Sequence, residues 1–238
     1  MSEVLQDTVV VVAGAGGGAG GAAVRNLAAA GATVVMADMS VDRLDPIAES
    51  VTAAGSGAAY GYAVDLLDEA ATRAWARSII EKFGRVDGVV HLVGGWRGGK
   101  GIVESDLGDW SLLSDLLIRT VQHTSRAFHD ALLAAPAGRY VLISAAAASH
   151  PTADNAAYGA AKAAAEAWTL AVGDSFRGSS AAATVLVVKA LLTPAMREAK
   201  PEGKFTGFTD VEDLASEIVA LWAKPAAEVN GARLWLTN

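Results

Sequence analysis

The 238-residue sequence contains no cysteine at all. Disulfide bonds, thiolate zinc sites, iron–sulfur clusters and cysteine nucleophiles are therefore excluded. Charged residues are also scarce, at 19% against 52% hydrophobic residues, and this balance excludes a disordered chain. A chain of this length and composition can bury a large hydrophobic core without covalent cross-links.

Basic residues are fewer than acidic ones, 19 against 26, which gives a net charge of −7. Nucleic-acid binding needs clustered Lys and Arg, so we expect no nucleic-acid partner. We also expect no membrane span, because the apolar stretch over residues 8–24 is too short to cross a bilayer and contains six glycines. Residues 1–3 lack the basic start of a signal peptide, which leads us to expect a cytoplasmic protein. The four histidines show no ligand spacing, so no metal is predicted.

Short aliphatic runs alternate with longer amphipathic segments along the chain. The runs expected to form strands are residues 9–12, 33–36, 59–64, 86–93, 140–143, 184–188 and 232–236. The segments expected to form helices are residues 22–30, 41–54, 68–83, 106–135, 155–176 and 211–222. This alternation predicts parallel strands joined by right-handed crossovers. Since no linker divides the chain, we predict one doubly wound, Rossmann-type α/β domain over residues 1–238, with about seven parallel strands and helices on both faces.

A glycine-rich loop separates the first expected strand from the first expected helix. Glycine at positions Gly14, Gly18 and Gly20 allows the backbone to turn sharply and to approach a pyrophosphate at the positive N-terminus of the helix. Asp38 ends the second strand, 20 positions after Gly18, where its carboxylate can accept hydrogen bonds from both ribose hydroxyls of an adenosine. Neither of the next two residues supplies a cation for a 2′-phosphate. The sequence therefore predicts a dinucleotide site that prefers NAD(H) to NADP(H).

Tyr158 and Lys162 stand four positions apart in an expected helix, so their side chains lie on one face of it. A free tyrosine, with a pKa of about 10, is a poor acid–base group at neutral pH. A nearby ammonium, together with a positively charged nicotinamide, should favour the phenolate and lower that pKa. We interpret Tyr158 as the acid–base group and Lys162 as the residue that tunes it, whereas the alternative is an incidental pair on a helix surface.

Taken together, the loop at residues 13–20, Asp38, Asp65 and the Tyr158–Lys162 pair resemble the short-chain dehydrogenase/reductase family, from about residue 8 to residue 236. The resemblance implies nicotinamide chemistry, with the tyrosine as acid or base and the lysine holding the nicotinamide ribose. It also implies a homodimer or homotetramer, paired through the helices expected at 106–135 and 155–176. The further cofactor contacts that it implies are Ala19, Asp65 near the adenine, Leu66, Val93, Gly94, and Thr193 near the nicotinamide amide.

Two residues of the family's catalytic set are missing. The family serine lies thirteen positions before the tyrosine, at Ala145, while Ser144 is one position too early; the helix asparagine falls at Leu117. We therefore place Ser144 and Ala145 beside the substrate without a catalytic role, and leave open whether Ser144 replaces the serine. These losses keep an alternative in view, a non-catalytic dinucleotide-binding redox sensor. The tyrosine favours the enzyme, because a binding protein does not need it.

One branch of the family, the dihydropteridine reductases, is similar in lacking this serine. Residues 94–99, which contain a Gly-Gly-Trp sequence, Ala145 and residues 191–197 resemble that branch. The resemblance implies reduction of a quinonoid dihydropterin by NADH, and a simple carbonyl substrate remains the other possibility. Trp96 is expected either to stack against a flat substrate or to cover core. Residues 194–208 are expected to form a mobile flap over the substrate.

Overall fold

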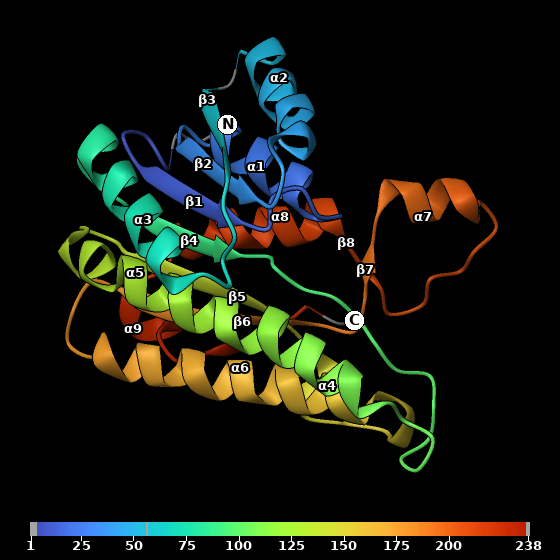
Figure 1. The fold of residues 1–238 in the computed structure, drawn as a ribbon. Helices are drawn as coiled ribbons and strands as arrows, with labels where there is room; N and C mark the ends of the chain where they lie inside the picture. The colour runs from blue at the N-terminus through green and yellow to red at the C-terminus, as the bar shows by residue number, and fades with distance from the viewer. Residues whose placement is uncertain (1–3, 56, 237–238) are drawn as a thin grey trace.

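The computed structural model describes residues 4–55 and 57–236, so residues 1–3, 56 and 237–238 of the expected domain lie outside the described residues. A seven-stranded sheet in the order β3-β2-β1-β4-β5-β6-β9 forms its centre (Figure 1). The strands are β1 (Val9–Ala13), β2 (Thr33–Asp38), β3 (Ala58–Ala63), β4 (Gly88–His91), β5 (Arg139–Ala145), β6 (Ala182–Val188) and β9 (Arg233–Trp235). Every neighbouring pair is parallel. The predicted doubly wound α/β domain is confirmed.

Helices cover both faces of this sheet. One face carries α1 (Gly20–Ala29), α2 (Asp45–Ala53) and α8 (Val211–Ala220), and the other carries α3 (Glu69–Phe83), α5 (Thr120–Ala134) and α6 (Ala156–Ser175) (Figure 1). Within the described part of the chain, no helix is long and apolar enough to cross a bilayer.

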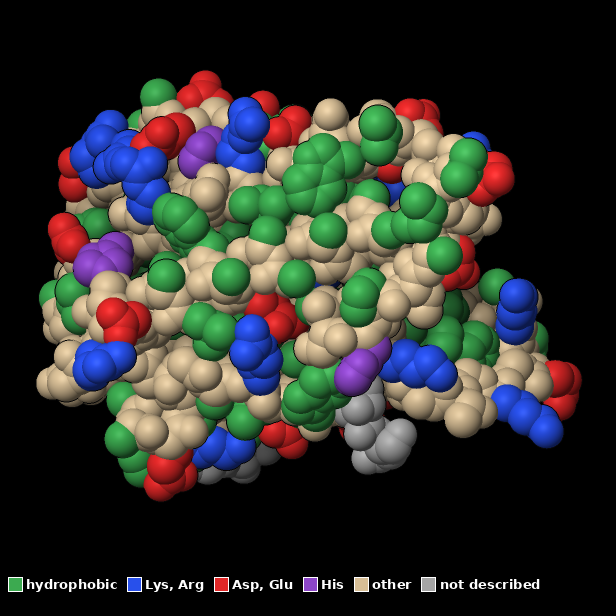
Figure 2. All heavy atoms as spheres, turned by 90° about the horizontal axis from the view of Figure 1, so that it is seen from below, with side chains coloured by type: hydrophobic (Ala, Val, Ile, Leu, Met, Phe, Trp, Pro, Cys, Tyr) green, Lys and Arg blue, Asp and Glu red, His purple; other side chains and the backbone are tan. Residues whose placement is uncertain are grey.

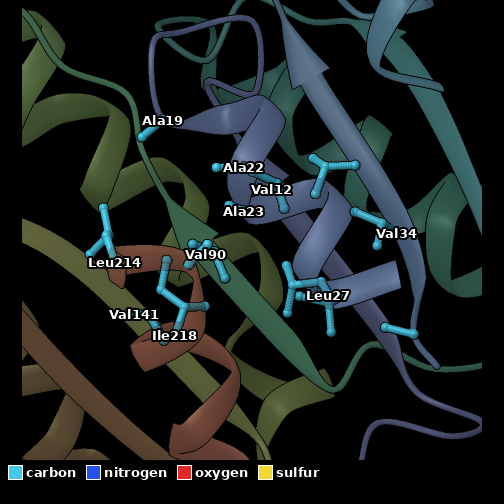
Figure 3. Close-up of a cluster of buried hydrophobic side chains, with 14 of the residues drawn as sticks. Val12, Ala19, Ala22, Ala23, Leu27, Val34, Val90, Val141, Leu214 and Ile218 are labelled. Carbon is cyan, nitrogen blue, oxygen red and sulfur yellow. The ribbon is translucent and has the colours of Figure 1, made fainter. Parts of the chain in front are cut away.

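The central strands are buried because both of their faces are covered. All five residues of β1, four valines and an alanine, are buried, as are all residues of β5 and β6. Figure 3 shows how α1 and α8 meet over the sheet: Ala22, Ala23 and Leu27 from α1 and Leu214 and Ile218 from α8 pack on valines of four strands. Small alanines on α1 allow the helix to lie close to the strands, which fixes where its N-terminus points.

Two of the expected helices are interrupted. The segment 106–135 forms α4 (Leu107–Ser114), a π-helical turn (Asp115–Arg119) and α5. The segment 41–54 begins with a separate 3₁₀ turn (Val41–Arg43) before α2. Several short elements have no counterpart in the sequence prediction: α7 (Pro194–Ala199), α9 (Ala226–Val229) and a two-stranded parallel sheet of β7 (Leu191–Leu192) and β8 (Thr209–Asp210). The fourth strand is shorter than expected, ending at residue 91.

Candidate active site

Two adjoining clefts open at the carboxyl ends of the central strands. We call the first the tyrosine cleft; it has a volume of about 370 Å³ and includes Tyr158, Lys162 and Trp96 in its lining. The second, the aspartate cleft, has a volume of about 230 Å³ and includes Asp38 and Asp65. Gly14, Gly17, Leu92, Val93 and Gly94 line both clefts. The carboxyl edge of a parallel sheet is where doubly wound proteins bind their ligands.

The glycine-rich loop connects the end of β1 to α1. At two of its positions neighbouring backbone atoms come too close for any residue other than glycine. Gly14 has φ of +78°, and a Cβ added there would lie 2.7 Å from the Val93 nitrogen. A Cβ on Gly20 would lie 1.8 Å from the Ala15 carbonyl oxygen. The N-cap residue of α1, Ala19, makes no side-chain hydrogen bond to the helix N-terminus. The loop therefore leaves backbone N–H groups at a helix N-terminus, a cradle that suits a phosphate group.

Asp38 faces this loop from the end of β2. One carboxylate oxygen accepts a hydrogen bond from the Gly16 N–H at 3.0 Å, and the other accepts one from the Met39 N–H at 2.8 Å. The guanidinium of Arg43 lies 3.4 Å from the same carboxylate. As the sequence showed, neither of the two residues after Asp38 supplies a cation, but Arg43, five positions further on, does, because the 3₁₀ turn after β2 brings it back.

Other residues expected to contact the cofactor also line one or other of the two clefts. Asp65 is exposed in the aspartate cleft, and its carboxylate accepts a hydrogen bond from the Leu67 N–H at 2.9 Å. Leu66 is buried, and its carbonyl bonds to Nδ1 of His123 at 2.8 Å. Thr193 lines the tyrosine cleft, and its methyl group lies 3.0 Å from the position of a Cβ on Gly18. Among the lining residues that the sequence did not predict are Leu116, which lies in the unexpected π-helical turn, and Thr120, which follows it.

Tyr158 and Lys162 both lie on α6, one turn apart, and both line the tyrosine cleft. Gly159 allows the backbone after β5 to approach this turn, since a Cβ there would lie 2.8 Å from the Ala147 carbonyl oxygen. The buried Lys162 ammonium donates to the Ile143 carbonyl at 2.8 Å and lies 6.0 Å from the centre of the tyrosine ring.

Burial governs the titration of this pair. It lowers the pKa of Lys162 to about 8, although the negative charge of Glu166 acts in the opposite direction. It raises the pKa of Tyr158 above the ordinary value for a phenol. The expected lowering, which the lysine and a positively charged nicotinamide would bring about together, stays a prediction; in the chain by itself burial dominates the Tyr158 pKa, and the ammonium donates to a backbone carbonyl.

The end of β5 carries Ser144 and Ala145, and both line the tyrosine cleft. The Ser144 hydroxyl donates to the Glu166 carboxylate at 2.6 Å, and both side chains are buried. Arg233 of β9 binds the other oxygen of Glu166 at 2.6 Å. The hydroxyl one position before Ala145 thus donates to a buried carboxylate that Arg233 also binds.

A leucine cluster takes the place of the family's helix asparagine. Leu117 lies in the π-helical turn, is 1% exposed and packs with Leu113 and Ala161, against which Tyr158 also packs. The tyrosine's neighbours from α4 and the π-helical turn in this cluster are therefore apolar, which is consistent with its raised pKa.

Trp96 extends from the loop after β4 and is 56% exposed. The loop is fastened to the start of α6 by a hydrogen bond from the Gly99 N–H to the Asp154 carbonyl at 2.7 Å. An indole so exposed covers little core, so its position in the cleft lining agrees better with the stacking interpretation. Residues 194–208, the expected flap, form α7 and a loop that project from the body of the molecule (Figure 1).

Beneath the clefts, His91 ends β4 in a fully buried hydrogen-bond network. Its two ring nitrogens lie 3.1 Å from the hydroxyls of Thr120 and Thr124, and the latter is 3.0 Å from the Tyr140 hydroxyl. Burial lowers the pKa of His91 to about 3, so it is neutral. It thus packs and hydrogen-bonds at the strand end. Among the described residues, no cluster of three or more His, Asp or Glu side chains could hold a metal ion.

A family model described as short chain dehydrogenase matches residues 8–203 of the chain. A curated relative, an uncharacterised oxidoreductase from Staphylococcus epidermidis, is 27% identical over 145 residues. That alignment covers 61% of this chain and 61% of the relative, so the two are matched over less than two thirds of their lengths.

Solved structures agree with this match in their fold. An NAD⁺-bound xylitol dehydrogenase is 19% identical with a TM-score of 0.87, and the alignment covers 98% of each chain. A short chain dehydrogenase from Shigella flexneri, complexed with NADP, is 21% identical with a TM-score of 0.88 and 99% of each chain covered. Structural neighbours thus bind either nicotinamide cofactor. With its family model matched over both clefts and the whole of α6, this chain belongs to the short-chain dehydrogenase/reductase family.

Proposed function

We propose that this oxidoreductase transfers a hydride between a nicotinamide dinucleotide and a small organic substrate, with Tyr158 as the acid–base group. The observation that carries the proposal is that Tyr158 and Lys162 line one cleft together with the glycine-rich loop. Because burial raises the pKa of Tyr158, the phenol holds its proton at neutral pH. It is therefore ready to donate that proton to a substrate oxygen or nitrogen, as reduction requires.

The residues of the two clefts suit a dinucleotide. The loop at Gly14 and Gly20 offers a cradle that any added side chain would fill, and it opens at the N-terminus of α1. Asp38 would hold the adenosine ribose, while Lys162 and Thr193 would hold the nicotinamide end. When bound, the dinucleotide would supply or accept the hydride. The protein's own contribution is to orient it, to exclude water and to provide the proton from Tyr158.

For the cofactor, we propose a preference for NAD(H), supported by the carboxylate of Asp38. The adjacent Arg43 guanidinium, 3.4 Å away, offsets part of the repulsion that a 2′-phosphate would meet, so the preference should be modest. Calorimetric titration with NADH and NADPH tests this point. Arg43→Met should widen the preference, because it removes the compensating cation, and Asp38→Ser should reverse it. Equal affinities in the wild type that neither variant changes would refute the role of Asp38.

Two substrate classes fit the cleft so far, a quinonoid dihydropterin and a carbonyl compound. The dihydropterin is supported by Trp96, which could stack on a flat ring, and by alanine at position 145, since an electron-poor ring needs no serine to polarise it. A panel of ketones, quinones and quinonoid dihydropterin, followed by NADH oxidation, decides between them. Tyr158→Phe should cut turnover by about 10²-fold or more with cofactor affinity retained. Tyr62→Phe, on β3, is the matched control.

The competing proposal is a non-catalytic redox sensor, favoured by Leu117 and Ala145 at the positions of two family catalytic residues. The same panel separates it from the enzyme. A sensor would bind NADH but oxidise it with no member of the panel, and Tyr158→Phe would change nothing. Turnover that is lost in Tyr158→Phe would exclude the sensor.

We also propose a homo-oligomer in which α5 and α6 meet the same helices of a second copy. Figure 2 views the side on which α6 lies, and hydrophobic side chains there are spread along the middle of the face, with one group of Lys and Arg at a margin and others scattered over the face. Between α5 and α6 lies a hollow of about 350 Å³ that includes Trp168 and Val172 in its lining. Light scattering should report a dimer or tetramer, and Val172→Arg should dissociate it.

A further inference from the structure

Lys189 lines the tyrosine cleft but has no role in the cofactor binding proposed above. It directly follows β6 and lines the tyrosine cleft with Tyr158 and Trp96. Its side chain is exposed and extends along Gly207, so that a Cβ built on that glycine would lie 3.2 Å from Cδ and 3.6 Å from Nζ of the lysine. The side chain therefore runs from the end of β6, at the edge of the cleft, towards the segment that precedes β8.

No carboxylate neutralises this lysine within the described residues. Two arginines of nearby segments do have acidic partners: Arg97 lies 4.0 Å from Asp109, and Arg197 lies 3.8 Å from Asp210. Lys189 has no Asp or Glu oxygen within 4.0 Å in the described part of the chain, and neither has any other lysine there. What distinguishes Lys189 from the other exposed lysines is its place in the lining of the tyrosine cleft.

The cleft as a whole carries positive charge without negative charge in its described lining. Its described lining contains two charged side chains, Lys162 and Lys189, and both are cations. Lys162 is buried, and its ammonium donates a hydrogen bond to the Ile143 carbonyl. Lys189 is thus the charged group that remains exposed to an incoming molecule. Its positive field in a partly enclosed cleft favours an anionic occupant.

The cofactor's phosphates are not the obvious occupant. The phosphate cradle follows β1, whereas Lys189 follows β6, and β4 and β5 lie between these strands in the sheet. Three strand spacings amount to about 14 Å. Asp38 and Arg43, which would meet the adenosine, belong to the other cleft. The substrate therefore remains as the molecule whose charge Lys189 would meet.

We propose that Lys189 binds an anionic group of the substrate, so that the substrate is a small carbonyl compound carrying a carboxylate. This inference rests on the proposed hydride transfer and selects between its two substrate classes, because a neutral quinonoid dihydropterin offers the ammonium no charge. In reduction the carbonyl carbon receives the hydride and the carbonyl oxygen receives the Tyr158 proton, so that a keto acid becomes a hydroxy acid. Lys189 exchanges no atom, and Trp96 provides an aromatic wall for the remainder of the molecule.

Benzoylformate and its methyl ester are suitable probes, since they share an aromatic ring and a ketone and differ in charge. Calorimetric titration into NAD⁺-saturated protein measures binding without turnover. We expect the wild type to bind benzoylformate at least about tenfold more tightly than the ester, the range of a hydrogen bond to a charged group. Lys189→Met should abolish this difference and Lys189→Arg should keep most of it. Lys224→Met, which removes an equal charge far from the cleft, should leave it unchanged.

The proposal is overturned if the ester binds as tightly as the acid, if Lys189→Met keeps the preference, or if neither probe binds at millimolar concentration. It is also overturned if Lys189→Met weakens NAD⁺ binding by the same factor, since the lysine would then serve the cofactor. The proposed hydride transfer fails in a different way. A preference for the acid that depends on Lys189, without NADH oxidation by benzoylformate or other keto acids, would leave the anion site standing and refute the enzyme.

Discussion

Arg233→Met should destabilise the protein more than Glu166→Gln, although the two substitutions break the same ion pair. The Glu166 side chain is 2% exposed and accepts hydrogen bonds from Ser144 and Arg233, each at 2.6 Å. The Arg233 side chain is 43% exposed. If the arginine is lost, a carboxylate stays buried with one hydroxyl as its donor; if the carboxylate is lost, the arginine can turn to water.

The expected magnitudes follow from this difference in exposure. Removing the partner of a buried charge costs about 3–5 kcal/mol, and we expect the lower end because Arg233 reaches solvent. Glu166→Gln retains an acceptor for Ser144, so its cost should be about 1.5 kcal/mol, that of one weakened bond to a charged group. For a protein of this size each kcal/mol lowers Tm by about 2–4 °C. Arg233→Met should therefore lower Tm by roughly 6–12 °C, and Glu166→Gln by about half as much or less.

Urea denaturation at pH 7 with parallel thermal melts provides the measurement. Arg177→Met is the matched control, because its ion pair with Asp174 is solvent-exposed, with side-chain exposures of 82% and 66%. That variant should lose no more than about 1 kcal/mol. The reasoning is refuted if Glu166→Gln costs as much as Arg233→Met, or if Arg233→Met costs no more than the exposed control.

Three further outcomes are expected. Burial lowers the pKa of Lys162 to about 8 from 10.5, so the wild type should gain stability as the pH rises from 8 to 10.5. In urea denaturation, Lys162→Met should therefore be more stable than the wild type at pH 7, and this difference in the free energy of unfolding should shrink towards pH 10. His91, with a pKa lowered to about 3 from 6.5, should cost the wild type stability as the pH falls through that interval, by up to about 1.4 kcal/mol per pH unit, and His91→Gln should lose this component in acid titrations. Gly20→Ala should destabilise the fold by about 1–3 kcal/mol in thermal melts and abolish NADH binding in titrations, because the added Cβ would lie 1.8 Å from a carbonyl oxygen. Gly21→Ala is the control and should do neither, because its Cβ would meet only the flexible end of Arg25, at 3.2 Å.

Much of the architecture could be predicted because strong local signals specify it. β1 is a run of valines that only a doubly covered strand accommodates, and glycines or aspartates mark where the strands and helices end. The Tyr158–Lys162 pair was also predictable, because helical periodicity alone places both side chains on one face. The cleft that they share with Gly14 and Thr193 follows from the fold class.

The features that were missed depend on contacts between distant residues or on backbone detail. The leucine-rich pattern around Leu117 reads as one continuous helix, and nothing in it marks the extra residue of a π-helical turn. Arg43 approaches Asp38 only because a 3₁₀ turn tightens the connection after β2. Strand alternation could not decide what Ser144 binds, since its partner, Glu166, lies 22 residues away on α6.

The small sheet of β7 and β8 has a consequence for how this protein can be altered. It pairs Leu191 with Thr209 and Leu192 with Asp210, so the two ends of residues 193–208 are held one strand spacing apart, about 4.8 Å. The enclosed segment is thus a loop whose two ends are held together by strand pairing. The entropic cost of closing such a loop changes only slowly with its length. Segments of other lengths and sequences could be grafted between β7 and β8 without disturbing the central sheet. The segment that borders the tyrosine cleft can therefore be exchanged while the central sheet stays the same.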